Sequence, residues 1–300
     1  MAPAASPTAA SPTATLTVGP ISTPTLAATV SPTATPQVEE PLSAPRIEIK
    51  FDRFVSSGDR ALIEAGIDLT VDYFSAAAAA TELELNVYAF GDLDSLRSAL
   101  IETPLELPYA VDSLGGLSRR IAGTAAEAYP GTIFIYTGST RWRGLTSVHR
   151  VRVAAHEFFH VLQMEMIGLE LTRAIYTTPP NQERREGPSW LIEGSADYVS
   201  WKVLEAAGLV SLDDFLGRSD PSATFDLRQI ETYLGFIAAH EDGIIVPLEA
   251  IDLVSLGDLA AILRFYVALG EGSPWRIAFH RAFGQSVESF YAEFESISDP

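Results

Sequence analysis

The chain has 300 residues, a formal net charge of −19 at pH 7 and no cysteine. The acidic balance argues against nucleic-acid binding, because proteins that bind phosphate backbones present a basic surface. The lack of cysteine excludes disulfide bonds and thiolate metal ligands. No stretch approaches the roughly 18 uninterrupted apolar residues that a membrane-spanning helix needs, so we expect no transmembrane segment.

Composition divides the chain into two parts. Residues 1–44 consist almost entirely of Ala, Pro, Ser, Thr and Val, with runs such as "SPTAASPTAT". Such a segment cannot bury enough apolar surface to offset the entropy of ordering it, so we predict a disordered linker or stalk. We expect one folded domain over residues 45–300. The stalk-like composition is typical of an extracellular or surface-tethered protein, although Met1 is not followed by the pattern of a signal peptide.

The first half of the expected domain alternates strands and helices. The spacing of polar and apolar residues predicts, in chain order, a strand at 44–52, a helix at 56–80, a strand at 82–90, a helix at 92–102 and a strand at 131–138. The last of these, "GTIFIYTG", is a β-branched and aromatic run between two glycines, which is typical of a buried strand.

The second half of the domain is mostly helical. We predict helices at 147–167 and 189–207. Each is followed by a glycine in the position of a C-cap, Gly168 and Gly208. Further helical patterns follow at 226–240, 247–254, 256–269 and 273–296. Strands first and helices later predict an α+β fold, in which a small mixed N-terminal sheet with helices precedes a mostly helical half.

One helical segment, "VAAHEFFHVLQ" at residues 153–163, carries two of the chain's five histidines. At 3.6 residues per turn, His156 and His160 lie one above the other on one helix face, where both imidazoles can bind one metal ion. Glu157 is rotated about 100° from His156, so it can reach a metal-bound water as a general base without becoming a ligand. This H-E-x-x-H pattern is typical of zinc peptidases.

A catalytic zinc ion needs a third protein ligand and an open position. The extended motif H-E-x-x-H-x-x-G-x-x-H is absent, because Gln163 and Met166 stand where its glycine and third histidine belong. Glu193, within "PSWLIEGSADYVSW" on the second predicted helix, is our candidate for the third ligand of one zinc ion. The competing carboxylates, none in a comparable setting, are Glu165, Glu170, Glu183 and Glu186.

Asp197 lies four residues after Glu193 and therefore shares its helix face. A carboxylate there can accept a hydrogen bond from the second ring nitrogen of a ligand histidine, which fixes the histidine tautomer. We assign this role to Asp197, with His156 as its partner. The small residues Gly194 and Ala196 are expected to let the two helices pack closely around the ion.

The pair "HEFFHVLQ" and "SWLIEGSADYVS" resembles the gluzincins, the thermolysin-like zinc peptidases of the MA clan, and in particular the peptidase-MA-like domain. The second block of that signature, W-L-x-E-G-x-A-x-Y, is matched at Trp190, Leu191, Glu193, Gly194, Ala196 and Tyr198. The likeness covers about residues 130–296. It implies a gluzincin-like metallopeptidase domain at 45–300, with zinc in a cleft between the sheet and a zincin-type helical half.

The resemblance also implies how a substrate is held. In the family, an extended peptide lies antiparallel to an edge strand that precedes the active helix. The candidates here are Ile133, Phe134, Ile135 and Tyr136. Related enzymes stabilise the oxyanion with a Tyr or His beyond the second helix; Tyr233 is the preferred candidate and His240 the alternative. Val246 stands where a tyrosine is expected in related sequences.

The sequence supports two hypotheses of function. The first is a zinc-dependent peptidase that cleaves a peptide or protein substrate by metal-activated water, with Glu157 as the base. An endopeptidase is favoured, because the G-x-M-E-N segment that binds the free amine in related aminopeptidases is absent. The alternative is a stalked, zinc-containing module that binds peptides without turnover. Neither substrate preference nor oligomeric state follows from the sequence.

Overall fold

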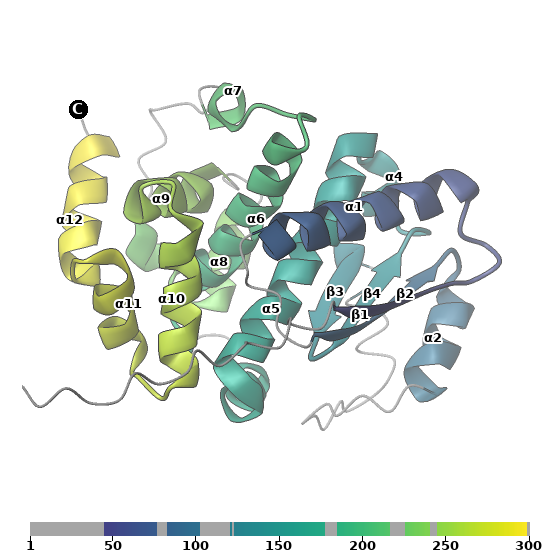
Figure 1. Ribbon diagram of the computed structural model, residues 1–300, viewed down its shortest axis with the longest axis horizontal. Helices are drawn as coiled ribbons and strands as arrows, with labels where there is room; N and C mark the ends of the chain where they lie inside the picture. Colours follow the sequence, from purple (N-terminus) through teal and green to yellow (C-terminus); the bar gives the residue numbers. More distant parts are fainter. Residues whose placement is uncertain are drawn as a thin grey trace, which may run out of the picture. The chain divides into compact units, whose positions relative to one another are not determined.

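Four strands form one mixed sheet with the spatial order β1-β2-β4-β3. In the computed structural model these are β1 (Arg46–Phe51), β2 (Glu84–Phe90), β3 (Ala126–Tyr129) and β4 (Thr132–Tyr136) (Figure 1). β1, β2 and β4 run parallel, whereas β3 pairs antiparallel with β4. β3 is therefore one edge of the sheet and differs in direction from every other strand.

β4 is an interior strand, which corrects the prediction that residues 133–136 form an edge for substrate. Ile133 pairs with Val87 of β2 on one side and with Ala128 of β3 on the other. A strand bonded on both sides has no backbone groups left for a substrate strand. The sequence pattern does not predict β3, because its four residues, "AEAY", are too few to show an alternation.

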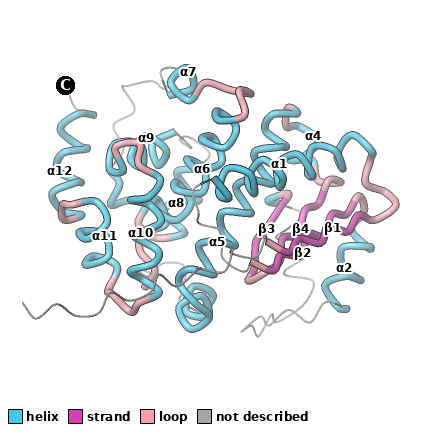
Figure 2. The backbone as a smooth tube through the Cα atoms, viewed as in Figure 1, coloured by secondary structure: helices cyan, strands magenta, loops and turns pink. Residues whose placement is uncertain are grey.

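Helices cover both faces of the sheet (Figure 2). They are α1 (Ser57–Ala76) on one face and α2 (Leu93–Glu102) on the other. Because side chains alternate along a strand, Ile133 joins the buried cluster that contains Ile67 of α1, whereas Phe134 joins the cluster that contains Leu96 of α2. β4, in the interior of the sheet, is thus buried on both faces, as strands of a parallel sheet usually are.

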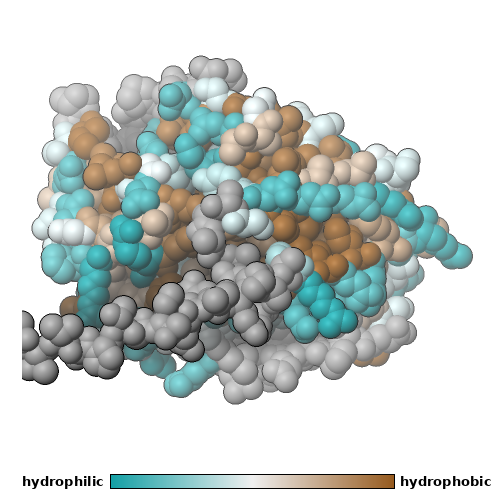
Figure 3. Space-filling view, in the orientation of Figure 1, coloured by the Kyte–Doolittle hydropathy of each residue, from teal (hydrophilic) through white to brown (hydrophobic). Residues whose placement is uncertain are grey.

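α1 is amphipathic along its length. Ile63, Ile67 and Phe74 are buried. Glu64 and Asp68 lie on the opposite, exposed side, and Figure 3 shows a hydrophilic band over this helix. The helix therefore packs against the sheet and the next long helix by one face only.

The central helix is α5 (Ser147–Thr177), which packs beside β3 and α1. Its backbone breaks at Gly168 (φ 77°, ψ 163°), where the sequence predicts the helix end, and helical structure then resumes to Thr177. Glycine adopts a positive φ without steric strain, so this residue permits the break. The unbroken part before Gly168 carries the H-E-x-x-H pattern.

Two contacts hold the start of α5 in place. Asp59 of α1 accepts hydrogen bonds from Nε1 of Trp142 at 2.8 Å and from the guanidinium of Arg150 at 3.1 Å. Trp142 belongs to the short helix α4 (Thr140–Gly144), and Arg150 to α5. One carboxylate thus links three helices about two turns before His156.

A close approach of α1 to α5 depends on Gly66. A Cβ atom at this position would lie 2.4 Å from the carbonyl oxygen of Val151 and 2.7 Å from Cβ of Ala154. Any larger residue would therefore push the two helices apart at the turn just before His156.

The elements described after α5 are all helical, and the predicted α+β fold is confirmed. Its elements are α6 (Ser189–Ala206), α7 (Leu212–Leu216), the 3₁₀ turn η1 (Leu227–Ile230), α8 (Tyr233–His240), α9 (Ile245–Ser255), α10 (Leu259–Gly270), α11 (Trp275–Phe283) and α12 (Val287–Ser298). Two predicted helices are each divided in the structure: 226–240 into η1 and α8, and 273–296 into α11 and α12. The second division falls at Gly284, whose φ of 78° ends α11.

The structure describes residues 45–76, 83–102, 121, 123–177, 185–216, 226–240 and 245–298. The linker expected at 1–44 lies outside these ranges, whereas Leu42–Pro300 forms one compact unit. In the described part, no single helix has the length and apolarity to cross a membrane. Val246–Ser255 and Leu259–Gly270 reach that length and composition only when taken together, and they meet at 93°.

Candidate metal centre

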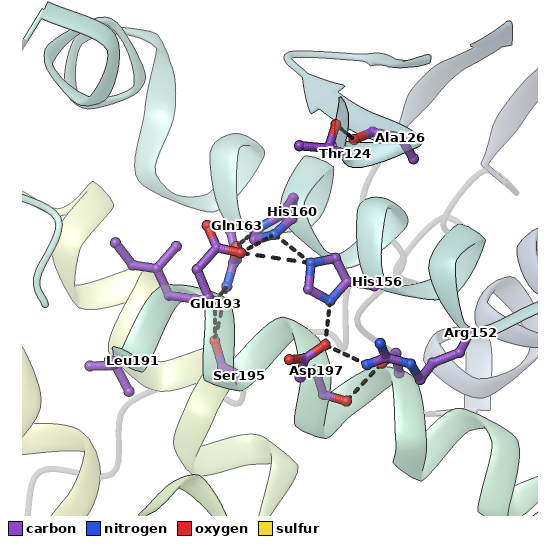
Figure 4. A network of polar contacts seen from close by, with 12 residues as sticks. Thr124, Ala126, Arg152, His156, His160, Gln163, Leu191, Glu193, Ser195 and Asp197 are labelled. Carbon is purple, nitrogen blue, oxygen red and sulfur yellow. Dashed lines mark hydrogen bonds and ion pairs between the residues drawn. The ribbon is translucent and has the colours of Figure 1, made fainter. Parts of the chain in front are cut away.

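Three side chains that the sequence proposes as metal ligands converge in the structure (Figure 4). His156 and His160 project from α5, and Glu193 projects from α6. One ligand atom from each lies within 4.8 Å of the other two. Within the described ranges, no other group of His, Asp or Glu side chains is gathered in this way.

The separations of the three atoms match one bound metal ion. Nε2 of His156 lies 3.0 Å from Nε2 of His160. Oε2 of Glu193 lies 3.2 Å from Nε2 of His160 and 3.8 Å from Nε2 of His156. Ligands bound tetrahedrally to zinc at about 2.0–2.1 Å stand about 3.3 Å apart, so one ion fits among these atoms.

The three side chains of the group are partly accessible to solvent. The side chains of His156, His160 and Glu193 keep 17%, 16% and 24% of their surface exposed. A catalytic zinc site requires an open position for water or substrate, whereas a structural site is closed by a fourth protein ligand.

His156 is oriented by the carboxylate that the sequence assigns to it. Oδ1 of Asp197 lies 2.9 Å from Nδ1 of His156. The same oxygen accepts a hydrogen bond from the guanidinium of Arg152, one turn earlier on α5. With an acceptor at Nδ1, this nitrogen keeps its proton, and Nε2 is the nitrogen that faces His160 and Glu193 and that can bind a metal.

His160 has a different partner, Gln163, which the sequence motifs do not predict. Oε1 of Gln163, one turn further along α5, lies 2.6 Å from Nδ1 of His160. The amide nitrogen of Gln163 lies near acceptors on α6 and on Tyr266 of α10. Both imidazoles are therefore held through Nδ1, so that both Nε2 atoms point at the same place.

The charges around the site favour a cation. Burial lowers the pKa of His156, but the carboxylates of Asp197, Glu193 and Glu157 together outweigh this effect and raise it to about 10. Burial acts the same way on His160, and Glu193 raises its pKa. Burial opposes ionisation of Glu193, yet the two imidazoles hold its pKa well below the usual range. A potential that binds protons this firmly also attracts a divalent metal ion.

Glu157 lies next to the group without belonging to it. Burial raises the pKa of this carboxyl, and the nearby His156 and His160 oppose that rise. Its carboxylate is not among the three clustered ligand atoms. This is the arrangement that the helix geometry predicts for a base beside the metal rather than a fourth ligand.

The other candidates are distributed over the rest of the fold. Glu165 and Glu170 are exposed, Glu186 is buried outside the clustered group, and Glu183 lies outside the described residues. Tyr233 begins α8 with a half-buried side chain, and α8 packs against α6. His240 ends α8, but its side chain lies outside the described part of the structure.

Four residues around the site contact it in ways that the sequence motifs do not predict. They are Arg152, Gln163, Ser195 and Tyr266. Arg152 precedes His156 by four residues and Gln163 follows His160 by three, so helical spacing places both on the histidine face and could have identified them. Ser195 and Tyr266 have no such signal, because their role depends on how α6 and α10 pack against α5.

Residues 149–229 match the family model of the M61 glycyl aminopeptidase. The matched segment contains the H-E-x-x-H pattern of α5 and all of α6, including Glu193. No curated protein and no solved structure matches the chain. M61 is a family of zinc metallopeptidases, so over these residues the chain is similar to a metallopeptidase, and the match supports that class of enzyme.

Proposed function

We propose that the protein is a gluzincin-type zinc endopeptidase in which His156, His160 and Glu193 hold one zinc ion. The observation that carries this proposal is the convergence of three ligand atoms within 4.8 Å, with both histidines held through Nδ1. A bound zinc ion would polarise the substrate carbonyl and make water acidic enough to react at neutral pH.

Glu157 is the general base of this proposal. It takes a proton from the water that adds to the peptide carbonyl carbon, and it passes this proton to the amine nitrogen as the C–N bond breaks. Burial raises its pKa, which makes the carboxylate a better proton acceptor than an exposed glutamate. Asp197, with Arg152, keeps His156 in the tautomer that the ligand role requires.

Because β4 is bonded on both sides, the substrate peptide must bind elsewhere along the sheet. We propose that an extended peptide lies along the β3 side of the sheet, because β3 is one of the two edge strands of the sheet and packs against α5. β4 no longer has this role.

The oxyanion donor is proposed to be Tyr233, with His240 as the alternative. α8 carries both residues and packs against α6, the helix of Glu193. Val246, where related sequences have a tyrosine, lies buried on α9 and offers no donor. Tyr233→Phe is expected to lower kcat about 10²–10³-fold with zinc retained, the usual effect of removing one such donor.

The family whose model matches is named for a glycyl aminopeptidase, so experiments must distinguish endopeptidase from aminopeptidase cleavage. We propose endopeptidase activity, because the sequence lacks the amine-binding G-x-M-E-N segment. An internally quenched peptide with an acetylated N-terminus and an amidated C-terminus can be cut only by an endopeptidase. A glycyl anilide reports aminopeptidase activity instead.

The decisive experiment combines metal analysis with these two substrates. We expect about one zinc per chain from the three-ligand count, loss of zinc in His156→Ala, and cleavage of the blocked peptide. A protein that binds no zinc after reconstitution would disprove the proposal. A protein that binds zinc and cuts neither substrate would instead support the stalked, zinc-containing peptide-binding module. Cleavage of the glycyl anilide alone would replace endopeptidase by aminopeptidase.

A further inference from the structure

A buried polar network connects His160 to two other helices. Its centre is Gln163, whose side chain is 3% exposed. The amide nitrogen of Gln163 lies 3.0 Å from the carbonyl oxygen of Ile192, 2.9 Å from Oγ of Ser195 and 2.8 Å from the hydroxyl of Tyr266. Ile192 and Ser195 belong to α6 and flank Glu193, whereas Tyr266 belongs to α10.

The network permits only one orientation of the Gln163 amide. A backbone carbonyl can only accept a hydrogen bond, so the amide atom 3.0 Å from the oxygen of Ile192 must be the NH₂ group. In the reversed amide, two oxygens would face each other in a buried position without a proton between them, at a high cost. Oε1 must therefore face Nδ1 of His160 and accept a hydrogen bond from it.

The hydroxyls of Ser195 and Tyr266 complete the network. They lie 2.7 Å apart, and Ser195 also donates to the carbonyl oxygen of Ile192 at 3.0 Å. The Tyr266 hydroxyl reaches the carbonyl oxygen of Leu191 at 3.4 Å. The two NH₂ hydrogens and the two hydroxyl hydrogens thus have acceptors within reach, so no donor competes for Oε1 of Gln163.

We propose that Gln163 and Tyr266 are positioning residues for the metal site: Tyr266 and α6 fix the Gln163 amide, which fixes the tautomer and orientation of His160. This inference rests on the proposed zinc site and adds residues that touch neither metal nor substrate. Because the same amide is bonded on both sides of Glu193, it also couples the position of the third ligand to that of His160. A hydroxyl on α10 thereby contributes to metal affinity from outside the ligand group.

The two histidines are then supported in different ways. His156 faces a carboxylate, Asp197, whose charge is balanced by Arg152, whereas His160 faces a neutral amide. With zinc bound, the charges of Glu157, Glu193, Asp197 and Arg152 would sum to zero with the metal. A second carboxylate at position 163 would add an uncompensated buried charge.

The test measures zinc affinity by competition with a chelator in four variants. Gln163→Leu removes the acceptor for His160, and we expect zinc affinity to fall about 10–100-fold, the usual effect of losing such a partner. Tyr266→Phe removes one hydroxyl and keeps the buried ring, and we expect a smaller loss of about three- to tenfold. Gln163→Glu keeps an acceptor oxygen for His160, so its zinc affinity should exceed that of Gln163→Leu.

Tyr291→Phe is the matched control. Tyr291 of α12 is also buried. Its hydroxyl accepts a hydrogen bond from Nε1 of Trp190 and donates one to Glu231, neither of which is a proposed ligand or a member of the Gln163 network. We expect its zinc affinity to equal that of the wild type. The visible spectrum of the cobalt-substituted protein should change in Gln163→Leu and Tyr266→Phe and stay unchanged in Tyr291→Phe, because it reports ligand geometry directly.

Folding is followed by circular dichroism and by thermal unfolding with and without zinc. Wild-type zinc affinity in folded Gln163→Leu and Tyr266→Phe proteins would overturn the inference and leave the zinc site itself intact. If the wild-type protein binds no zinc, the proposed function fails first. If Gln163→Leu does not fold, the zinc affinities of Tyr266→Phe and Tyr291→Phe still test the inference: equal affinities would overturn it.

Discussion

Nε2 of His156 lies 3.0 Å from Nε2 of His160, one helical turn further along α5. Each ring is held through its other nitrogen by an acceptor, Asp197 for the first and Gln163 for the second. Two imidazole lone pairs that face each other at this distance repel unless a cation lies between them. A proton or a metal ion must therefore lie between the two nitrogens. Oε2 of Glu193 provides a third ligand atom nearby, which makes the position suitable for a metal ion.

Replacing the proposed base separates chemistry from metal binding. Glu157→Gln is expected to lower kcat about 10²–10⁴-fold, because the amide cannot take a proton from water. The zinc content should stay that of the wild type, since Glu157 is not a ligand. Glu165→Gln, an exposed glutamate two turns further along α5, serves as the control and should keep full activity. Loss of zinc in Glu157→Gln would make this residue a ligand instead.

Breaking the Arg152–Asp197 ion pair should affect both stability and metal affinity. Both side chains are largely buried, at 14% and 7% exposure. Asp197→Asn leaves a buried guanidinium without its counterion, which costs about 3–5 kcal/mol of unfolding free energy. Zinc affinity should fall about 10–100-fold. Urea unfolding in the presence of a chelator measures the first effect, and chelator competition the second.

An exposed ion pair provides the comparison for Asp197→Asn. Arg276 and Glu288 pair at the surface with 44% and 65% of their side chains exposed. Glu288→Gln should change stability by less than about 1 kcal/mol, because solvent screens the pair. Equal effects of the two substitutions would show that burial of the Arg152–Asp197 pair has no energetic consequence.

Zinc affinity should rise with pH. A metal can bind His156 only through a bare Nε2, and the carboxylates of Asp197, Glu193 and Glu157, working against burial, raise the pKa of this imidazole to about 10. Below that pH, zinc must displace a proton, so affinity increases by up to about tenfold per pH unit for each proton released. Chelator competition across neutral pH measures the slope. Asp197→Asn should lower the pKa of His156 and make this slope smaller; a pH-independent wild-type affinity would contradict the raised pKa of His156.

Gly194, next to the proposed ligand, should tolerate no side chain. A Cβ atom there would lie 2.9 Å from Cβ of Pro247 and 3.0 Å from its carbonyl oxygen. The small residue thus lets α9 approach α6, which corrects the expectation that it serves the contact between α6 and α5. Gly194→Ala is expected to cost about 1–3 kcal/mol of unfolding free energy. Gly144→Ala, where nothing lies within 4 Å, should be near neutral in the same denaturation assay.

Local spacing determines a large part of this protein. The alternation of "ELELNVYAF" predicts β2, and the i, i+4 spacing of His156 and His160 places both rings on one face of α5. The same spacing relates Glu193 to Asp197 on α6. These features follow from the sequence alone because helix and strand periods fix where neighbouring side chains point.

Only the tertiary structure decides how separate segments meet. Strand order carries no local signature, so the sequence could not tell that β3 would take the edge and enclose β4. Packing of α5, α6 and α10 brings Gln163, Ser195 and Tyr266 together from positions up to 103 residues apart. Such contacts depend on the packing of distant segments rather than on periodicity. The sequence therefore predicts the two histidine ligands but not the hydrogen bonds among Gln163, Ser195 and Tyr266.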